Sequence, residues 1–461
     1  MISDSNVVGL LYLVAILCFV VALRFLSSPR HARKGNWIGG AGMLVAIATT
    51  ALLEDIGNWA FIVVGALIGT VVGVVGARTV RMTAMPQMVA IFNGVGGGAA
   101  ALVALAEWHK AIEPDSQETV SIVLSALIGS ISFAGSVIAF AKLQELMSGR
   151  PIVFPGQNVV NIVVVAGAVA FGIVAIGGVE NEWVLYALIL LALGFGVMFV
   201  LPIGGADMPV VISLLNAFTG LAASATGFVL DSTVLIVSGM LVGAAGTLLT
   251  MLMAKAMNRS VANVLFGAFG QVRVAGAGAR EEDGRTVRAT SPEDVAVQLS
   301  FARKVIIAPG YGMAVAQAQH DVRQLADLLE EKGVDVRYAI HPVAGRMPGH
   351  MNVLLAEANV PYTLLAEMDE INPEFPQTDV VLVIGANDVT NPAARSDPSS
   401  PIYGMPILDV DKAASIVVMK RSMNPGFAGI DNELYLDPKT TMLFGDAKES
   451  VLKLISAVKS L

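Results

Sequence analysis

Nine predominantly apolar stretches of about 20 residues fill the first 260 positions of this 461-residue chain. A helix of about 20 such residues crosses the hydrocarbon core of a bilayer, so each stretch predicts a membrane span. Residues 1–260 hold 11 Lys+Arg and 12 Asp+Glu, whereas residues 261–461 hold 18 and 25. We therefore expect a transmembrane domain over 1–260, a connector over 261–300 and a soluble domain over 301–461. The predicted spans are 7–26, 37–53, 59–77, 85–106, 119–141, 158–178, 183–203, 208–230 and 233–254.

The low content of charged residues excludes several classes of protein. Charged residues make up 14% of the chain, against about 25% in soluble globular proteins. With 55% hydrophobic residues and a net charge of −8, disorder and a nucleic-acid partner are both excluded. Cys18 is the single cysteine, so an intrachain disulfide scaffold is excluded as well.

Charge separates the loops between the predicted spans into two sets. Because positive loops stay on the cytoplasmic side, this separation places the N-terminus outside and the soluble domain in the cytoplasm. One set carries Arg30, Arg33, Lys34, Arg78, Arg81, Lys142, Arg150, Lys255 and Arg259. The alternate set carries Glu54, Asp55, Glu107, Glu113, Asp115, Glu118, Glu180, Glu182 and Asp231, with Lys110 as its cation.

The soluble part alternates between strand and helix patterns. Ser291-Pro292 predicts a helix start, with serine as the cap and proline in the first turn. Alternating strands and helices imply a mostly parallel, doubly wound sheet. The expected strands are Lys304–Ala308, Val334–Ile340, 379–384, Ser415–Met419 and Met442–Phe444, and the expected helices are Met313–Lys332, 349–358 and Lys448–Val458.

A glycine-rich turn follows the first of these strands. The run Gly310-Tyr311-Gly312-Met313-Ala314-Val315 is a variant of the dinucleotide-binding fingerprint, with valine in place of the third glycine or alanine. Glycines there permit a tight turn and a close approach of pyrophosphate to the backbone. The strand–turn–helix context favours nucleotide binding over a plain connecting turn.

The residues after the later strands indicate which nucleotide binds. An NAD site usually has an acidic residue at the end of the second strand, but here that strand runs into His341 and Pro342. Lys420, Arg421 and Ser422 follow a later strand instead, and two cations with a hydroxyl suit a 2′-phosphate. This pattern predicts NADP(H); a solvated pair of surface charges is the alternative.

Two further segments lie at strand ends. Asn387 and Asp388 follow the strand 379–384, where Asp388 could sense the charge of the nicotinamide or simply cap a turn. The stretch Asn424–Gly429 could form a lid over the cofactor. His341 and His350 have no third ligand at a metal-binding spacing, so we predict no metal site.

The predicted spans hold few polar residues that could carry a proton. Asn93 lies in the middle of the fourth span, Asp207 lies between the seventh and eighth, and Asn216 lies deeper in the eighth. Polar residues inside a membrane are functional candidates, although hydrogen bonding between helices explains the asparagines equally well. Asp207 could also act as a helix cap before Pro209.

Several motifs together resemble the β subunit of proton-translocating NAD(P)+ transhydrogenases, and the likeness covers essentially the whole chain. They are Gly310–Gln319, His341–Glu357, Gly385–Asp388 and Lys420–Asn424 in the soluble part, with Gly204–Val210 and Ala256–Ser260 in the membrane part.

The resemblance implies that this chain binds NADP(H) and accepts hydride from NADH held on a separate α subunit. Hydride transfer would be coupled to inward proton passage, in a dimer of αβ units within the lipid of a bacterial inner membrane. It further implies that Asp388 lies near the nicotinamide and that Asp207, Asn216 and Arg259 belong to the coupling path. Several relatives have histidine where this chain has Asn93, which leaves Asn93 a channel-lining candidate.

From the residues and the resemblance together we expect the following cofactor-binding set: Gly310, Tyr311, Gly312, Met313, Ala314, Val315, Val343, Ala344, Gly345, Arg346, Gly385, Ala386, Asn387, Asp388, Lys420, Arg421, Ser422, Met423, Asn424, Gly426, Phe427, Ala428, Gly429, Asp446 and Ala447. Two alternatives remain open at this point. One is a channel or transporter gated by an NADP(H)-sensing domain without catalysis, and the other is a membrane anchor for a soluble NADP(H) oxidoreductase.

Overall fold

A computed structural model describes most of the chain, and its residues form two compact units, each described here by itself. One unit comprises Met1–Gly204 with Val210–Thr250, and the other comprises Gly205–Pro209 with Met251–Leu461. The described residues are 5–28, 31–53, 57–80, 84–110, 115–144, 146–147, 151–178, 181–204, 207–256, 260–266, 287–345, 349–398, 400, 402–426 and 428–461.

Nine long helices occupy the positions of the nine apolar stretches. Within the described residues, eight are long and apolar enough to cross a membrane; the exception is α2, whose first turn carries Arg33 and Lys34. The chain is therefore a membrane protein with a polytopic helical domain. The bounds are α1 Ser5–Leu26, α2 Ala32–Ala51, α3 Trp59–Thr79, α4 Met85–Lys110, α5 Ser116–Leu143, α6 Gln157–Ile176, α7 Glu182–Val200, α8 Met208–Val229 and α9 Thr233–Ala256.

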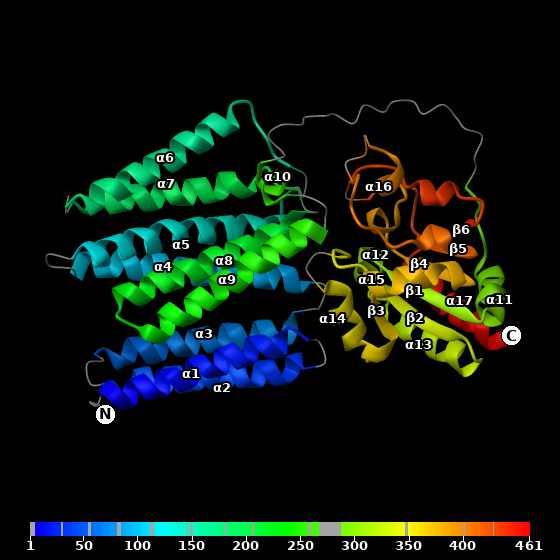
Figure 1. The fold of residues 1–461 in the computed structure, drawn as a ribbon, viewed down its shortest axis with the longest axis horizontal. Helices are drawn as coiled ribbons and strands as arrows, with labels where there is room; N and C mark the ends of the chain where they lie inside the picture. The colour runs from blue at the N-terminus through cyan, green and yellow to red at the C-terminus, as the bar shows by residue number, and fades with distance from the viewer. Residues whose placement is uncertain are drawn as a thin grey trace. The chain divides into compact units, whose positions relative to one another are not determined.

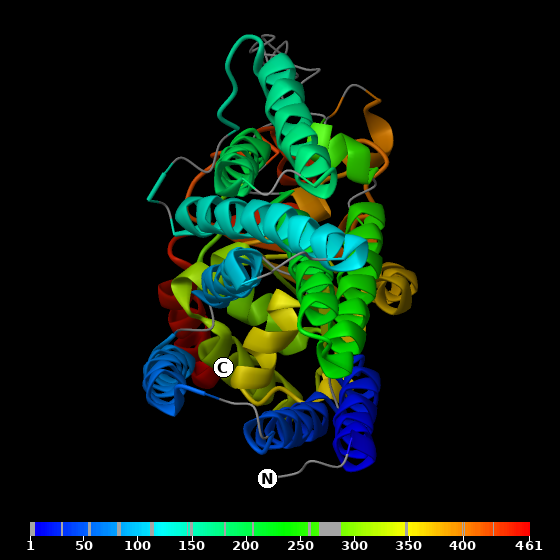
Figure 2. The ribbon, with the colours of Figure 1, turned by 90° about the vertical axis from the view of Figure 1, so that its left-hand side faces the viewer.

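Helix α5 forms the centre of the helical unit. It packs extensively against α4 and α7, whereas α1 packs on α2 and α6 packs on α7 (Figure 1). Figure 2 shows α1, α2 and α3 on the side of this unit away from α6 and α7. None of the residues of α3, all of which the structure describes, is buried.

The glycines of the helical unit divide into two groups. A Cβ at Gly97 of α4 would lie 2.9 Å from the Gly129 carbonyl oxygen of α5, and one at Gly129 would lie 2.6 Å from the Gly97 carbonyl oxygen. Small residues therefore let α4 and α5 pack closely against each other. On α3, by contrast, a Cβ added at Gly65 would meet no other atom within 4 Å.

Lys142 lies inside the helical unit and not in a loop. It belongs to the last turn of α5 and is only 3% exposed. Counting it among the loop cations was wrong, because its ammonium is buried and donates to the backbone carbonyls of Leu201 and Ile203, just after α7.

The second unit is built on a six-stranded parallel sheet in the order β3-β2-β1-β4-β5-β6. The order reverses between β1 and β4, which creates the crevice where doubly wound folds bind ligands. This confirms the predicted Rossmann-like class. The strands are β1 Lys304–Pro309, β2 Asp335–Ile340, β3 Leu365–Glu367, β4 Val380–Ile384, β5 Ser415–Lys420 and β6 Thr440–Phe444.

Apolar side chains on both faces bury the sheet. Alternate residues such as Ile306, Val381 and Ile416 pack with Phe375 and Leu434 on one face. Helix α17, Ala447–Ser460, packs against three other helices (Figure 1). These are α11 Pro292–Phe301, α12 Tyr311–Ala316 and α13 Gln319–Glu331. Helix α14, His350–Glu357, packs against α13. Strands buried on both faces explain the continuous apolar runs in the sequence.

Two details of the predicted elements need correction. The helix expected over Met313–Lys332 is two helices, α12 and α13, because Gln317 adopts a left-handed conformation (φ +52°) between them. Strand β3 was not predicted, since three residues are too few for a visible pattern. The cap at Ser291 is confirmed: its hydroxyl accepts a hydrogen bond from the Asp294 amide at 3.1 Å.

Candidate functional site

The turns after β1 and β4 are in backbone contact at the carboxyl edge of the sheet. The Gly310 amide donates to the Ile384 carbonyl at 2.9 Å, and the Gly312 amide donates to the Gly385 carbonyl at 3.0 Å. A Cβ on Gly310 would lie 2.3 Å from the Cα of Ala386. Glycine is thus required for the two turns to meet, a role that sequence reasoning did not assign to it.

The segment after β5 folds onto Asp388. The Ala428 amide donates to Asp388 Oδ2 at 3.0 Å. A Cβ on Gly426 would lie 2.6 Å from both Asn387 Nδ2 and Asp388 Oδ1. Gly426 and Ala428 therefore lie against the two residues Asn387 and Asp388 that follow β4.

Two polar residues that sequence reasoning missed support Asn387. The Tyr435 hydroxyl donates to Asn387 Oδ1 at 2.7 Å, and Asn432 Nδ2 donates to the same oxygen at 3.1 Å and to the Asn387 carbonyl at 3.0 Å. Burial raises the pKa of Tyr435, so the hydroxyl keeps its proton for this bond. Both partners lie more than 40 residues from Asn387, and no local pattern could reveal the contact.

The cationic residues after β5 differ in exposure. Lys420 Nζ donates to the Asn424 carbonyl at 2.6 Å and lies 4.8 Å from the centroid of the Tyr435 ring. Burial lowers the pKa of Lys420, and the negative charges of Asp388 and Asp431 partly offset this effect. Arg421, together with Ser422, is exposed and accessible to an anion.

The remaining candidates of the soluble part lie at neighbouring strand and helix ends. Ala344 is buried between the half-buried Val343 and Gly345, after β2. Asp446 caps α17, with Oδ1 accepting from the Lys448 amide at 3.0 Å, and Ala447 begins that helix. Tyr311, Met313, Ala314 and Val315 lie in α12. Met423 is exposed and directly precedes Asn424, which is also exposed and begins the stretch Asn424–Gly429.

His341 is a buried structural residue. Its Nε2 lies 2.8 Å from the Pro406 carbonyl, and its Nδ1 accepts from the Val343 amide at 3.2 Å. These bonds require a neutral ring with the proton on Nε2. Burial lowers the pKa of His341 to about 4, although the bond to Pro406 opposes the shift.

Acidification is expected to destabilise the α/β unit through His341. Between the ordinary value of 6.5 and about 4, the unfolded state binds more protons than the folded state, so stability falls as pH is lowered through this range. The loss reaches at most about 3 kcal/mol. Pulse proteolysis of the full chain in urea at pH 7 and pH 5 measures it. His341→Gln should reduce the pH dependence, and the exposed His320→Gln should not; equal pH dependence in both variants would contradict this assignment.

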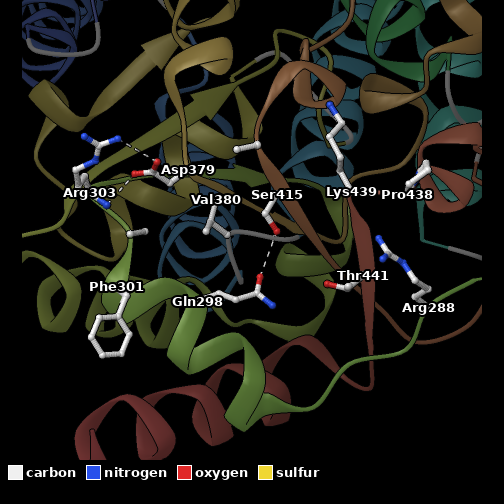
Figure 3. Close-up of a pocket in the computed structure, with 12 residues that line it drawn as sticks. Arg288, Gln298, Phe301, Arg303, Asp379, Val380, Ser415, Pro438, Lys439 and Thr441 are labelled. Atoms are coloured by element: carbon white, nitrogen blue, oxygen red, sulfur yellow. Dashed lines mark hydrogen bonds and ion pairs between the residues drawn. The ribbon is translucent and has the colours of Figure 1, made fainter.

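A cavity of about 570 Å³ opens at the opposite edge, where β1, β4 and β5 begin (Figure 3). Its cations are Arg288, Arg303 and Lys439. Arg303 lies 3.8 Å from Asp379, whose pKa is lowered chiefly by the Arg303 backbone amide, and Lys439 donates to the Ala413 carbonyl at 3.1 Å. Ligands of doubly wound sheets bind at the carboxyl edge, so this cavity does not lie where such folds hold a nucleotide.

In the helical unit, Asn93 is the first member of a buried hydrogen-bonded cluster. Its Nδ2 donates to Ser136 Oγ at 2.9 Å and to Ser132 Oγ at 3.4 Å. Ser132 Oγ also lies 2.6 Å from the hydroxyl of Thr219 on α8 and donates to the Leu215 carbonyl at 2.9 Å. We call Asn93, Ser132, Ser136 and Thr219 the hydroxyl cluster; it joins α4, α5 and α8.

Of the other candidates, the structure describes Asp207 and Asn216 in the membrane part. Asp207 directly precedes α8, at the position of a cap, and Asn216 is half-buried on that helix, one residue after Leu215. Three further candidates, Arg259, Arg346 and Phe427, lie outside the described residues.

The long apolar helices define an integral membrane protein. The strand order, the contacting glycine turns and the exposed Arg421 after β5 define its second unit as a dinucleotide-type α/β domain. A family profile described as NAD(P) transhydrogenase beta subunit matches residues 8–457. Two relatives from Rhodospirillum rubrum, one from a particular strain, are each named NAD(P) transhydrogenase subunit beta. Both are 50% identical over 459 residues, covering 97% of this chain and 98% of the relative. The chain belongs to the NAD(P) transhydrogenase β-subunit family, an oxidoreductase family associated with nicotinamide nucleotides.

Proposed function

We propose that this chain binds NADP(H) and exchanges hydride with NAD(H) held on a partner α subunit. The observation that carries the proposal is the exposed pair Arg421 and Ser422 at the carboxyl edge, beside the glycine turns of β1 and β4. Cations and a hydroxyl match a 2′-phosphate, which NADP(H) has and NAD(H) lacks.

The residues at this edge fit the nucleotide. Gly310 to Val315 would lie under the pyrophosphate, Arg421 and Ser422 would hold the 2′-phosphate, and Asn387 and Asp388 would lie toward the nicotinamide. The bound nicotinamide supplies the hydride chemistry. Tyr435 and Asn432 keep the Asn387 amide oriented, and the stretch Asn424–Gly429 excludes water when it lies against Asp388.

We further propose that hydride transfer is coupled to inward proton passage through the helical unit. The hydroxyl cluster supports this, because hydroxyl groups both donate and accept hydrogen bonds and can relay a proton. Asn93 has no titratable group, so a partner helix or ordered water must supply the carrier. The protein would lie in a bacterial inner membrane, with the N-terminus outside and the α/β domain in the cytoplasm, as a dimer of αβ units.

Reconstituted vesicles test this function. The chain and its copurified α subunit should reduce an NADP+ analogue with NADH and move protons inward at the same time. Proton or ion flux without hydride transfer would instead support a nucleotide-gated channel. In the same vesicles Asp207→Asn should alter both pumping and NADP(H) affinity, and wild-type values for both would remove Asp207 from the coupling path.

Ser132→Ala is expected to reduce proton translocation about tenfold, because it removes the hydroxyl that links the Asn93 side chain to Thr219. NADP+ binding should stay unchanged. A pH-sensitive dye inside the vesicles measures translocation. The matched control is Ser238→Ala on α9, whose hydroxyl bonds only to carbonyls of its own helix among the described residues. Equal rates for the two variants would remove Ser132 from the path.

A further inference from the structure

Lys142 is a buried cation to which the proposed function assigns no role. Its Nζ donates to the Leu201 carbonyl at 2.5 Å, the Ile203 carbonyl at 2.8 Å and the Val200 carbonyl at 3.4 Å. All three partners among the described residues are backbone oxygens. Val200 ends α7, and the other two lie in residues 201–204, which we call the α7–α8 turn. Three acceptors match the three protons of an ammonium group.

The position of this ammonium is electrostatically favourable. The last carbonyls of a helix lack partners within the helix and carry a partial negative charge. An ammonium that is only 3% exposed is costly in a membrane unless such groups surround it. Loss of the side chain would therefore leave the carbonyls of the α7–α8 turn without their charged donor.

The same end of α5 is tied to α4 as well. Gln87, which is buried on α4, donates through Nε2 to the Leu143 carbonyl at 3.1 Å. Gln87 lies on the helix that carries Asn93. The end of α5 thus binds α4 through Leu143 and the α7–α8 turn through Lys142.

Helix α5 also bears two members of the hydroxyl cluster, Ser132 and Ser136, ten and six residues before Lys142. There Ser132 bonds the Leu215 carbonyl and the Thr219 hydroxyl of α8. The α7–α8 turn and α8 are therefore both fastened to α5, the first by an ammonium and the second by a hydroxyl. Along the chain, the turn leads directly to Asp207 at the start of α8.

We propose that Lys142 is a positioning residue for proton coupling: its ammonium fastens the α7–α8 turn to α5, so that the turn and the hydroxyl cluster shift together. The proposal rests on the proposed function and adds a residue to it. Without the ammonium, the turn moves independently of α5, and proton passage loses its link to the nucleotide reaction.

The functional test uses the αβ complex in vesicles with an imposed proton gradient. Wild-type protein should reduce an NADP+ analogue faster when the gradient is present. Lys142→Met should lose most of this acceleration, about tenfold, while NADP+ affinity stays within about twofold. Lys142→Arg, which keeps a cation and its donors, should retain part of it. Lys255→Met is the matched control, since Lys255 is an exposed lysine in the last turn of α9.

A second measurement does not depend on activity. The amides of Leu201 and Ile203 are hydrogen-bonded within the end of α7, and their hydrogen exchange in Lys142→Met should be about tenfold faster than in wild type. Unchanged exchange, or an undiminished gradient response, would overturn the proposal. If wild-type vesicles show no gradient response, the proposed function fails, and the exchange result alone decides whether Lys142 holds the turn.

Discussion

Replacing Gly310 with alanine is expected to abolish NADP+ binding and to destabilise the α/β unit by more than about 2 kcal/mol. The new Cβ would lie 2.3 Å from Ala386 Cα and 2.4 Å from the Ala386 nitrogen. These are backbone atoms of a neighbouring strand end, so no side-chain rotation relieves the overlap. The turns after β1 and β4 must separate, which breaks the bond from Gly310 to the Ile384 carbonyl.

Gly333→Ala is the matched control for this variant. Gly333 has a left-handed backbone (φ +86°), and an added Cβ there meets nothing within 4 Å. Its replacement should cost only about 1 kcal/mol of backbone strain and leave nucleotide affinity intact. Pulse proteolysis in urea measures the stability of both variants, and equilibrium dialysis measures NADP+ binding. A loss of affinity in Gly333→Ala equal to that in Gly310→Ala would refute the steric explanation.

Arg421→Ala is expected to weaken NADP+ binding between about 10-fold and 100-fold, the range for losing a hydrogen bond to a charged group. The reason is that Arg421 is exposed at the end of β5 and free to pair with a 2′-phosphate bidentately. Binding of NAD+, which has no 2′-phosphate, should change little. The discrimination between the two nucleotides is therefore the diagnostic quantity.

Lys453→Ala on α17 supplies the control for Arg421, since it removes an exposed positive charge from a helix remote from the end of β5 along the chain. Titration of each variant with both nucleotides separates a local contact from a general change of charge. The 2′-phosphate assignment is wrong if Arg421→Ala weakens NADP+ no more than Lys453→Ala does.

The membrane helices and the parallel sheet could be predicted because each depends on a local pattern. Runs of about 20 apolar residues define the spans, and short apolar runs alternating with helical periodicity define the sheet. The break at Gln317 could not be predicted, because glutamine gives no signal for a left-handed backbone. Strand β3, with three residues, is shorter than any period that reveals a strand.

The contacts that organise the site depend on distance in space and not on sequence spacing. The glycine pattern at Gly310 indicated a nucleotide turn, but not that this turn rests on the Gly385 turn, 75 positions later. The hydrogen bonds from Tyr435 and Asn432 to Asn387 could not be predicted from the sequence for the same reason. Lys142 was misplaced because a cation near the end of an apolar run has the same signature whether it faces water or a carbonyl.

The hydrogen bonds of the hydroxyl cluster bear on the direction in which a proton would pass through it. Between Ser132 and Thr219, either oxygen can be the donor. When Thr219 donates, the Ser132 proton goes to the Leu215 carbonyl, and when Ser132 donates, the Thr219 hydroxyl can donate to the Asn93 carbonyl at 3.4 Å. Reversing this hydrogen bond requires only rotation of two O–H bonds, and no charge within the cluster favours one sense over the other. Such an arrangement would pass a proton equally well in both directions. If the cluster relays protons as proposed, the direction of net flow is set at its two ends, by the proton concentrations on either side and by the redox ratios of the two nucleotide pools.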